Sequence, residues 1–147
     1  MIDDRRQKGF TLTELLVAMT IFAIGILSVA TMQVTALQGN ASANTVSVAS
    51  SLGASVLDEI VSWDLEDPRF DVSSANNVWD FAPANLAVSS ITVPGAGTYN
   101  ARYDITVNYN GVPNVVRIEV RITGGSGKFG LSGNRVTRVV GFRSMLK

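Results

Sequence analysis

The distribution of apolar residues divides the chain into three parts, of which the first is almost continuously apolar. This part runs from Leu15 to Val34. Its polar interruptions are Thr20, Ser28, Thr31 and Gln33. About 20 mostly apolar residues suffice for a helix to span a bilayer. We therefore expect a membrane helix over Leu15 to Val34, inside an N-terminal helical segment of residues 10–34.

The second part has an apolar residue or a small residue at every third or fourth position. These positions are Val46, Ala49, Gly53, Val56, Ile60 and Trp63. Such spacing predicts an amphipathic continuation of the helix over residues 35–63, packed on another element. Gly39-Asn40 is the weakest point of this helix, so a bend there is left open.

Residues 64–98 contain three prolines and few periodic positions, which predicts a connecting loop with one short strand at Ile91 to Val93. The loop has an acidic group consisting of Asp64, Glu66, Asp67 and Asp71. Carboxylates can bind Ca²⁺, but this spacing lacks the full calcium-loop pattern. We interpret the group as a solvated loop, and we expect Trp79 and Phe81 to attach the loop to the domain.

The third part, residues 99–147, alternates with a period of two and predicts an antiparallel sheet. One strand covers Tyr103 to Tyr109 and a second covers Val116 to Ile122, with a turn at Asn110-Gly111. Arg135 to Phe142 predicts a third strand, although its apolar residues do not alternate cleanly. The expected fold is α+β, with the helix packed on a sheet of three to four strands. On its outer face we interpret the arginines as partners of nearby acids rather than as a binding patch; they are Arg117, Arg121 and Arg138.

Composition argues against an enzyme. The 147 residues include no His and no Cys, so the usual catalytic triads and zinc ligands are not available. The glycine-rich stretch Gly124 to Gly130 lacks the Lys-Ser or Lys-Thr of a phosphate-binding loop. Twelve basic and 12 acidic residues balance, which gives no nucleic-acid footprint. We expect no catalytic residue, no metal and no cofactor.

The leader, residues 1–9, has three basic residues, Arg5, Arg6 and Lys8, and the segment after the apolar run begins with neutral residues. The positive-inside rule places the leader in the cytoplasm and the C-terminal domain across the membrane. Three interpretations of the apolar run are open: a plain anchor, a precursor cut before the run, and a signal peptide cut after Ala30. Glu14 and the helical pattern beyond Ala30 argue against the signal peptide.

The junction Lys8, Gly9, Phe10, Thr11, Leu12 and Glu14, followed by the apolar run, resembles the prepilins of type IV pili and the pseudopilins of type II secretion. The resemblance implies a bacterial inner-membrane precursor that a prepilin peptidase cuts between Gly9 and Phe10 and methylates on the new α-amino group of Phe10. It also implies assembly with other pilins or pseudopilins through the N-terminal helix.

Within that family, Ile21 to Leu27, Leu57 to Ile60 and the lack of a C-terminal cysteine pair look most like the PilV-type minor pilins. A minor type IV pilin that joins the pilus or primes its assembly is thus the favoured function. A minor pseudopilin of type II secretion is the alternative within the family. A secreted binding or adhesion domain is the alternative from another class.

Glu14 is the one acid at the entrance of the apolar run, where a carboxylate is unfavourable and points to a function. The resemblance makes it an assembly contact that pairs with the α-amino group of Phe10, on a neighbouring subunit or on its own chain. The alternative is a carboxylate that extends to the lipid headgroups. Thr11 or Thr13 is expected to cap the helix.

Overall fold

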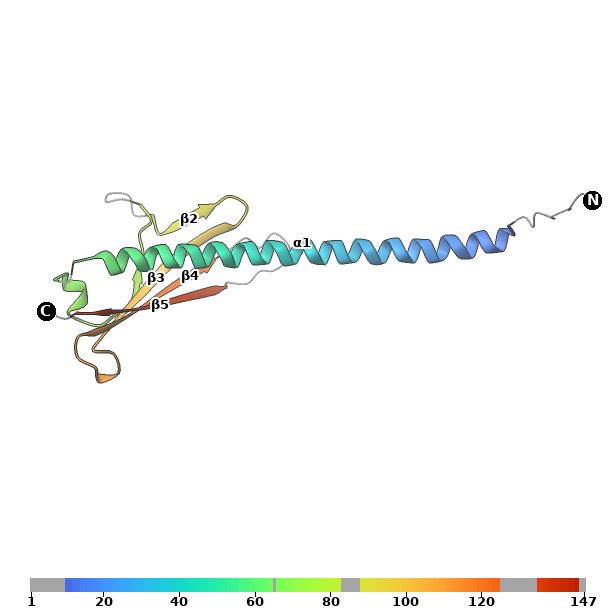
Figure 1. The fold of residues 1–147 in the computed structure, drawn as a ribbon. Helices are drawn as coiled ribbons and strands as arrows, with labels where there is room; N and C mark the ends of the chain where they lie inside the picture. Colours follow the sequence, from blue (N-terminus) through green and yellow to red (C-terminus); the bar gives the residue numbers. More distant parts are fainter. Residues whose placement is uncertain (1–9, 65, 83–87, 125–134, 146–147) are drawn as a thin grey trace, which may run out of the picture. The chain divides into compact units, whose positions relative to one another are not determined.

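The computed structural model describes residues 10–64, 66–82, 88–124 and 135–145. The described residues form one long helix, five strands and two short 3-10 helices. Figure 1 shows the helix and the strands of the sheet. The elements are α1 (Leu12–Ser62), η1 (Pro68–Phe70), β1 (Ser74–Val78), β2 (Ser90–Val93), β3 (Gly97–Val107), η2 (Tyr109–Gly111), β4 (Val115–Gly124) and β5 (Val136–Ser144). The chain forms two compact units, Met1–Gly39 and Asn40–Lys147. The α+β class predicted from the sequence is confirmed.

Within the first unit, the hydroxyl groups of α1 bond to the backbone of the preceding turn. Thr20 Oγ1 donates to the carbonyl of Leu16 at 2.8 Å, and Ser28 Oγ donates to that of Ile24 at 2.9 Å. A hydroxyl satisfied in this way needs no water, so it is compatible with an apolar surrounding. Gly39 and Asn40 are both helical, so the helix does not end at this pair.

In the second unit, β3 and β4 form the centre of an antiparallel sheet, and β5 extends it beyond β4. On the other side, β1 and β2 both pair with β3. The five strands exceed the three or four predicted, because residues 64–98 contribute two strands and a 3-10 helix rather than a loop with one short strand. The sequence prediction for this segment was therefore wrong in part.

Strand β1 was not predicted, because its sequence has no apolar alternation. Hydrogen bonds that involve side chains help to hold it against β3. Its register slips between Ser74 and Asn77, which marks a β-bulge, and Asn76 has a φ of 59°. The Asp104 carboxylate accepts from the Asn76 backbone N–H at 2.6 Å, and Asn77 Nδ2 donates to the Tyr103 carbonyl at 3.2 Å. Only tertiary contacts define this strand.

The core lies between α1 and the sheet, as the helical spacing predicted. Ala49, Gly53, Val56 and Ile60 are the buried residues of α1. Their partners are buried side chains of β3 and β4, namely Tyr99, Ala101, Tyr103, Ile105, Val116, Ile118, Val120 and Ile122. Val46 is 42% exposed, so the buried stripe begins at Ala49 rather than at Val46.

Two glycines allow α1 and β5 to approach closely. A Cβ placed on Gly53 of α1 would lie 2.7 Å from Val139 Cγ2. A Cβ placed on Gly141 of β5 would lie 2.9 Å from Leu57 Cδ1. Both distances are shorter than van der Waals contact. Neither position can therefore accept a side chain unless its neighbours move.

The end of α1 is fixed by aromatic residues and by β5. The Trp63 ring lies 6.0 Å from Phe70, 6.2 Å from Trp79 and 5.8 Å from Tyr103. Arg143 of β5 donates to the Trp63 carbonyl at 2.8 Å, which satisfies an acceptor beyond the helix end. Trp79 is buried and Phe81 packs on the core, so the loop aromatics attach to the domain as predicted.

The connection between β3 and β4 differs from the predicted turn at Asn110-Gly111. Tyr109 belongs to η2 and not to a strand, and Asn108 and Asn110 both have positive φ.

The apolar residues of the predicted third strand, which is β5, do not alternate because they lie on both faces of the sheet. Val139 of β5 faces α1, whereas Val136, Val140 and Phe142 are exposed on the other face.

Candidate processing and assembly site

Glu14 and Thr11 form a reciprocal cap at the start of α1. The Thr11 backbone N–H and hydroxyl each donate to Glu14 Oε2 at 2.9 Å. In return, Thr11 Oγ1 accepts from the Glu14 backbone N–H at 3.3 Å. This arrangement is a capping box, in which the side chain of the third helical residue returns to the N-cap. Of the two expected caps, Thr11 and Thr13, the structure selects Thr11, and Glu14 is its partner.

The capping box directs the Glu14 carboxylate toward the N-terminal end of the helix, next to Phe10. α1 begins at Leu12, so Phe10 precedes the N-cap residue and lies outside the helix. Phe10 is 88% exposed. The backbone nitrogen of Phe10 is only one residue from the N–H that Glu14 already binds. A charge created at Phe10 would therefore lie near a carboxylate that is already oriented.

The predicted cleavage point is the bond between Gly9 and Phe10. Gly9 and the basic residues of the leader lie outside the described residues, and Phe10 is the first residue that the structure describes. The site geometry therefore rests on Phe10, Thr11 and Glu14.

The helix surface that follows Glu14 is apolar and uncovered. Large apolar side chains at successive turns are exposed, among them Leu15, Leu16, Met19, Phe22, Ile26, Val29 and Met32. α1 is long and apolar enough to cross a membrane by length and composition, and its most apolar 18-residue window is unburied. A surface of this kind needs lipid or other apolar helices around it.

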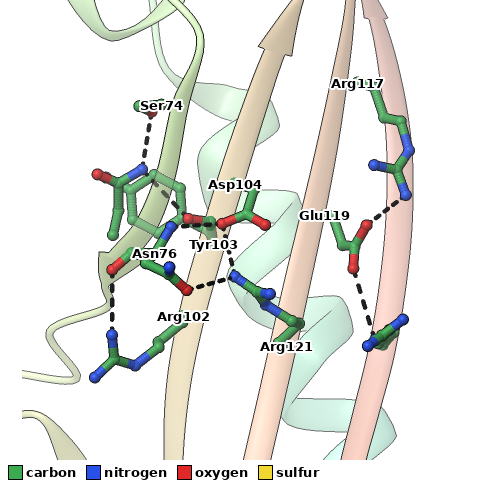
Figure 2. A network of polar contacts seen from close by, with 10 residues as sticks. Ser74, Asn76, Arg102, Tyr103, Asp104, Arg117, Glu119 and Arg121 are labelled. Atoms are coloured by element: carbon green, nitrogen blue, oxygen red, sulfur yellow. Dashed lines mark hydrogen bonds and ion pairs between the residues drawn. The ribbon is translucent and has the colours of Figure 1, made fainter.

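The arginines predicted for the outer face of the sheet pair with acids there, and Figure 2 shows the pairs of Arg117 and Arg121. Arg121 Nη2 lies 2.8 Å from Asp104 Oδ1 and 2.9 Å from Asn76 Oδ1. Glu119 forms ion pairs with Arg117 and, at 3.7 Å, with Arg138. The interpretation as cross-strand partners is confirmed for Arg121 and Arg138, whereas Arg117 pairs with Glu119 of its own strand. The role of Asn76 was missed, because nothing in the sequence indicates a bulge at this position.

In the acidic group of the loop, Asp64 and Asp67 accept hydrogen bonds from residues of the same loop. Asp67 accepts from the backbone N–H of Arg69 at 2.9 Å and from its Nη2 at 2.6 Å. The hydrogen bonds from Arg69 lower the pKa of Asp67 to about 2. Asp64 Oδ1 accepts from the backbone N–H of Glu66 at 3.2 Å. Within the described ranges, no group of three or more potential metal ligands comes together.

The glycine-rich stretch Gly124 to Gly130, which was considered as a phosphate-binding loop, lies outside the described residues except for Gly124. Gly124 itself ends β4, and its φ is 139°. A Cβ on Gly124 would lie 2.2 Å from the Thr98 carbonyl oxygen, so close strand packing explains this glycine.

Comparison with known proteins gives a match for the N-terminal segment alone. No curated protein and no solved structure matches the chain. Residues 4–30 match the family model described as the prokaryotic N-terminal methylation motif, a range that contains Gly9, Phe10, the Thr11–Glu14 capping box and most of the apolar run. The match supports a type IV pilin-like or pseudopilin-like precursor.

Proposed function

We propose that this protein is the precursor of a minor type IV pilin, which a prepilin peptidase cuts and methylates before it joins a pilus or primes pilus assembly. The observation that supports the proposal most directly is the methylation motif over residues 4–30. The α+β fold, with an uncovered apolar helix before a sheet domain, is the architecture expected of such a subunit. Proteins of this class are structural rather than enzymatic.

Cleavage between Gly9 and Phe10 would change how firmly the helix is held in the membrane. The leader carries Arg5, Arg6 and Lys8, and charges of this kind anchor a helix end to the cytoplasmic face. Their removal leaves a single α-amino group on Phe10. Extraction of the helix from the bilayer into a filament then becomes less unfavourable, because fewer charges must leave the membrane surface.

Glu14 would supply the specific contact in the assembled filament. A carboxylate among apolar helices is unfavourable unless a cation neutralises it. The α-amino group of Phe10 is such a cation, and attraction between opposite charges is strong where the effective dielectric constant is low. A subunit whose Glu14 meets the amino group of its neighbour would be held in one axial register.

The proposal includes a topology, with the leader in the cytoplasm, a single pass over Leu15 to Val34, and the sheet domain in the periplasm. The basic leader supports this orientation by the positive-inside rule. The proposed partners are the prepilin peptidase, the inner membrane and other pilins that contact the N-terminal helix.

The PilV-type branch remains our preferred assignment within the minor pilins, on the sequence features given above. A minor pseudopilin of type II secretion would share the same junction, capping box and helix. Purification of each filament type from cells that make the tagged protein distinguishes the two, since the subunit should copurify with pili and not with pseudopili.

The proposal is tested by the N-terminus of the mature protein. The full chain is produced in a bacterium with an active prepilin peptidase, and the intact mass and the N-terminal sequence are measured. N-methylated Phe10 is the expected terminus. A mature chain that begins at Thr31 would mean an ordinary signal peptide and a secreted domain, and an uncut chain would mean a plain anchor.

A variant at position 30 distinguishes cleavage between Gly9 and Phe10 from cleavage after Ala30. Signal peptidase requires small residues at its cleavage site, so Ala30→Leu would block cutting after Ala30. Under our proposal this variant is still cut between Gly9 and Phe10, because position 30 is remote from the junction.

A further inference from the structure

The two edges of the sheet differ in how well they are protected against pairing with a strand of another chain. One edge is formed by β1, which has five residues and a bulge, and by β2, which has four residues. Short and bulged strands hinder pairing with another chain. The other edge is β5, which has nine residues and pairs with β4 at nine consecutive positions without a shift. In the described ranges, no strand pairs with the far side of β5.

The backbone of β5 offers a regular set of hydrogen-bonding groups at this edge. Met145 N donates to the Asn114 carbonyl at 2.7 Å, and the Gly124 N–H donates to the Arg135 carbonyl at 3.3 Å. Antiparallel pairing alternates along a strand, so the odd-numbered residues of β5 bond to β4. The backbone groups that face the open edge therefore belong to Val136, Arg138, Val140, Phe142 and Ser144.

The same five residues place their side chains on the outer face, and three of them are apolar and exposed. Val136 and Val140 are exposed, and Phe142 is 60% exposed with its ring 5.6 Å from that of Tyr109. Arg117 lies over the Tyr109 ring, with 5.5 Å between Cζ and the ring centroid. An edge strand protected against pairing would carry few such apolar residues.

The charges of the outer face are not balanced near β5. Arg102, Arg121 and Arg138 lie side by side on three adjacent strands. With Arg117 they make four cations on the outer face of β3, β4 and β5, and these three strands contribute two carboxylates there, Asp104 and Glu119. Among these described residues, two positive charges remain. Arg138 has a side chain that is 67% exposed, and its contact with Glu119 is 3.7 Å long. Arg138, on the edge strand itself, is therefore more open to a partner than Arg117 or Arg121, whose side chains are 25% and 26% exposed.

We propose that the open edge of β5 binds an extended strand of a partner protein, with an acidic residue of that strand beside Arg138 and apolar residues beside Val140 and Phe142. The backbone groups supply the pairing, and the outer-face side chains select the partner. A second copy of this chain is disfavoured as the occupant, because its own outer face has an excess of positive charge. The inference does not rest on the proposed processing.

The test uses the full chain in detergent micelles and two synthetic peptides. The first peptide is Thr-Val-Thr-Val-Thr-Glu-Thr-Val-Thr, which in antiparallel alignment places Glu beside Arg138 and Val beside Val140 and Phe142. The second has Lys in place of Glu. We expect the Glu peptide to bind at least about tenfold more tightly than the Lys peptide, with amide NMR shifts confined to β5.

Two variants and one modified peptide complete the test. Arg138→Glu should reverse the preference between the peptides, whereas the matched control Arg102→Glu, two strands away in the same row, should leave the Glu peptide preferred. N-methylation of the peptide amides that face β5 should abolish binding. Circular dichroism and thermal unfolding establish that each variant is folded.

The proposal is overturned if neither peptide binds the wild-type chain, or if both bind equally. It is also overturned if the shifts fall on β1 and β2, or if the chain associates with itself through β5 and excludes the peptides.

Discussion

The hydroxyl of Tyr99 on β3 shares its one proton between two carbonyl acceptors, that of Thr45 on α1 at 3.2 Å and that of Ala96 at 3.0 Å. Tyr99 is fully buried, and the contact with Thr45 joins residues that are 54 positions apart. The Tyr99 ring thus contributes to the core while its hydroxyl fixes the sheet to the helix. Burial raises the pKa of this hydroxyl above its usual value.

Tyr99→Phe should keep the ring in the core and remove the hydroxyl. We expect a loss of about 1 kcal/mol in the free energy of unfolding, a typical net value for a hydrogen bond. Urea unfolding of the full chain in detergent measures the change. The raised pKa favours the neutral hydroxyl in the folded state, so its contribution is present below pH 10 and is lost as the pH rises through the folded-state pKa. A wild-type chain that loses no more stability above pH 10 than the Phe variant would contradict this assignment.

Gly53→Leu should destabilise the second unit because the new side chain would overlap Val139 and Ile122. Overpacking of this kind commonly costs about 1 to 3 kcal/mol. Gly39→Leu is the matched control, since it lies in the same helix and a Cβ there would meet nothing within 4 Å. The control should be neutral or slightly stabilising, because Leu favours the helix by up to about 1 kcal/mol over Gly. Equal urea midpoints for the two variants would contradict the close approach of α1 and β5.

Glu14→Gln separates the two roles that the capping box assigns to this side chain. Gln can cap a helix as Glu does, but it has no charge to pair with the α-amino group of Phe10. If the charge drives assembly, Glu14→Gln and Glu14→Ala should both be cut between Gly9 and Phe10 and both be depleted from filaments. Thr11→Ala, which removes the hydroxyl but keeps the carboxylate, should assemble better than either. The amount of each variant in sheared filaments, relative to the membrane fraction, is the measurement. Normal incorporation of Glu14→Gln would limit Glu14 to a capping role.

The contact between Asp67 and Arg69 predicts a local transition at acidic pH. Arg69 lies over the Trp63 ring, with 3.4 Å between Cζ and the ring centroid, and its ion pair with Asp67 holds it there. The pKa of Asp67 is lowered from 3.8 to about 2, so its stabilising contribution is present above pH 4 and is lost as the pH falls toward 2. Tryptophan fluorescence of the wild type should change over this interval. Asp67→Asn should lack that component, and a full-sized acid transition in this variant would refute the assignment.

The local features of the chain were predictable because local sequence determines them. Apolar run length predicted the first part of α1, helical spacing predicted the buried stripe, and alternation predicted β3 and β4. The alternating residues Val116, Ile118, Val120 and Ile122 are buried as expected. A threonine cap at the start of the helix was predictable because capping involves residues three positions apart, and the structure shows that Thr11 rather than Thr13 supplies it.

Tertiary structure decided the features whose partners are distant in sequence. β1 exists because Asp104 and the Tyr103 carbonyl bind Asn76 and Asn77, 26 to 28 residues away. The register of β5 follows from close packing against Gly53 and Leu57, and its apolar residues on both faces concealed that register in the sequence. Sequence by itself determined the apolar helix and the candidate processing junction, and it limited the cap to Thr11 or Thr13, since these features depend on neighbours within one or two turns. The bulged edge, the open edge and the paired charges of the outer face depend on which strands meet, and only the folded chain decides that.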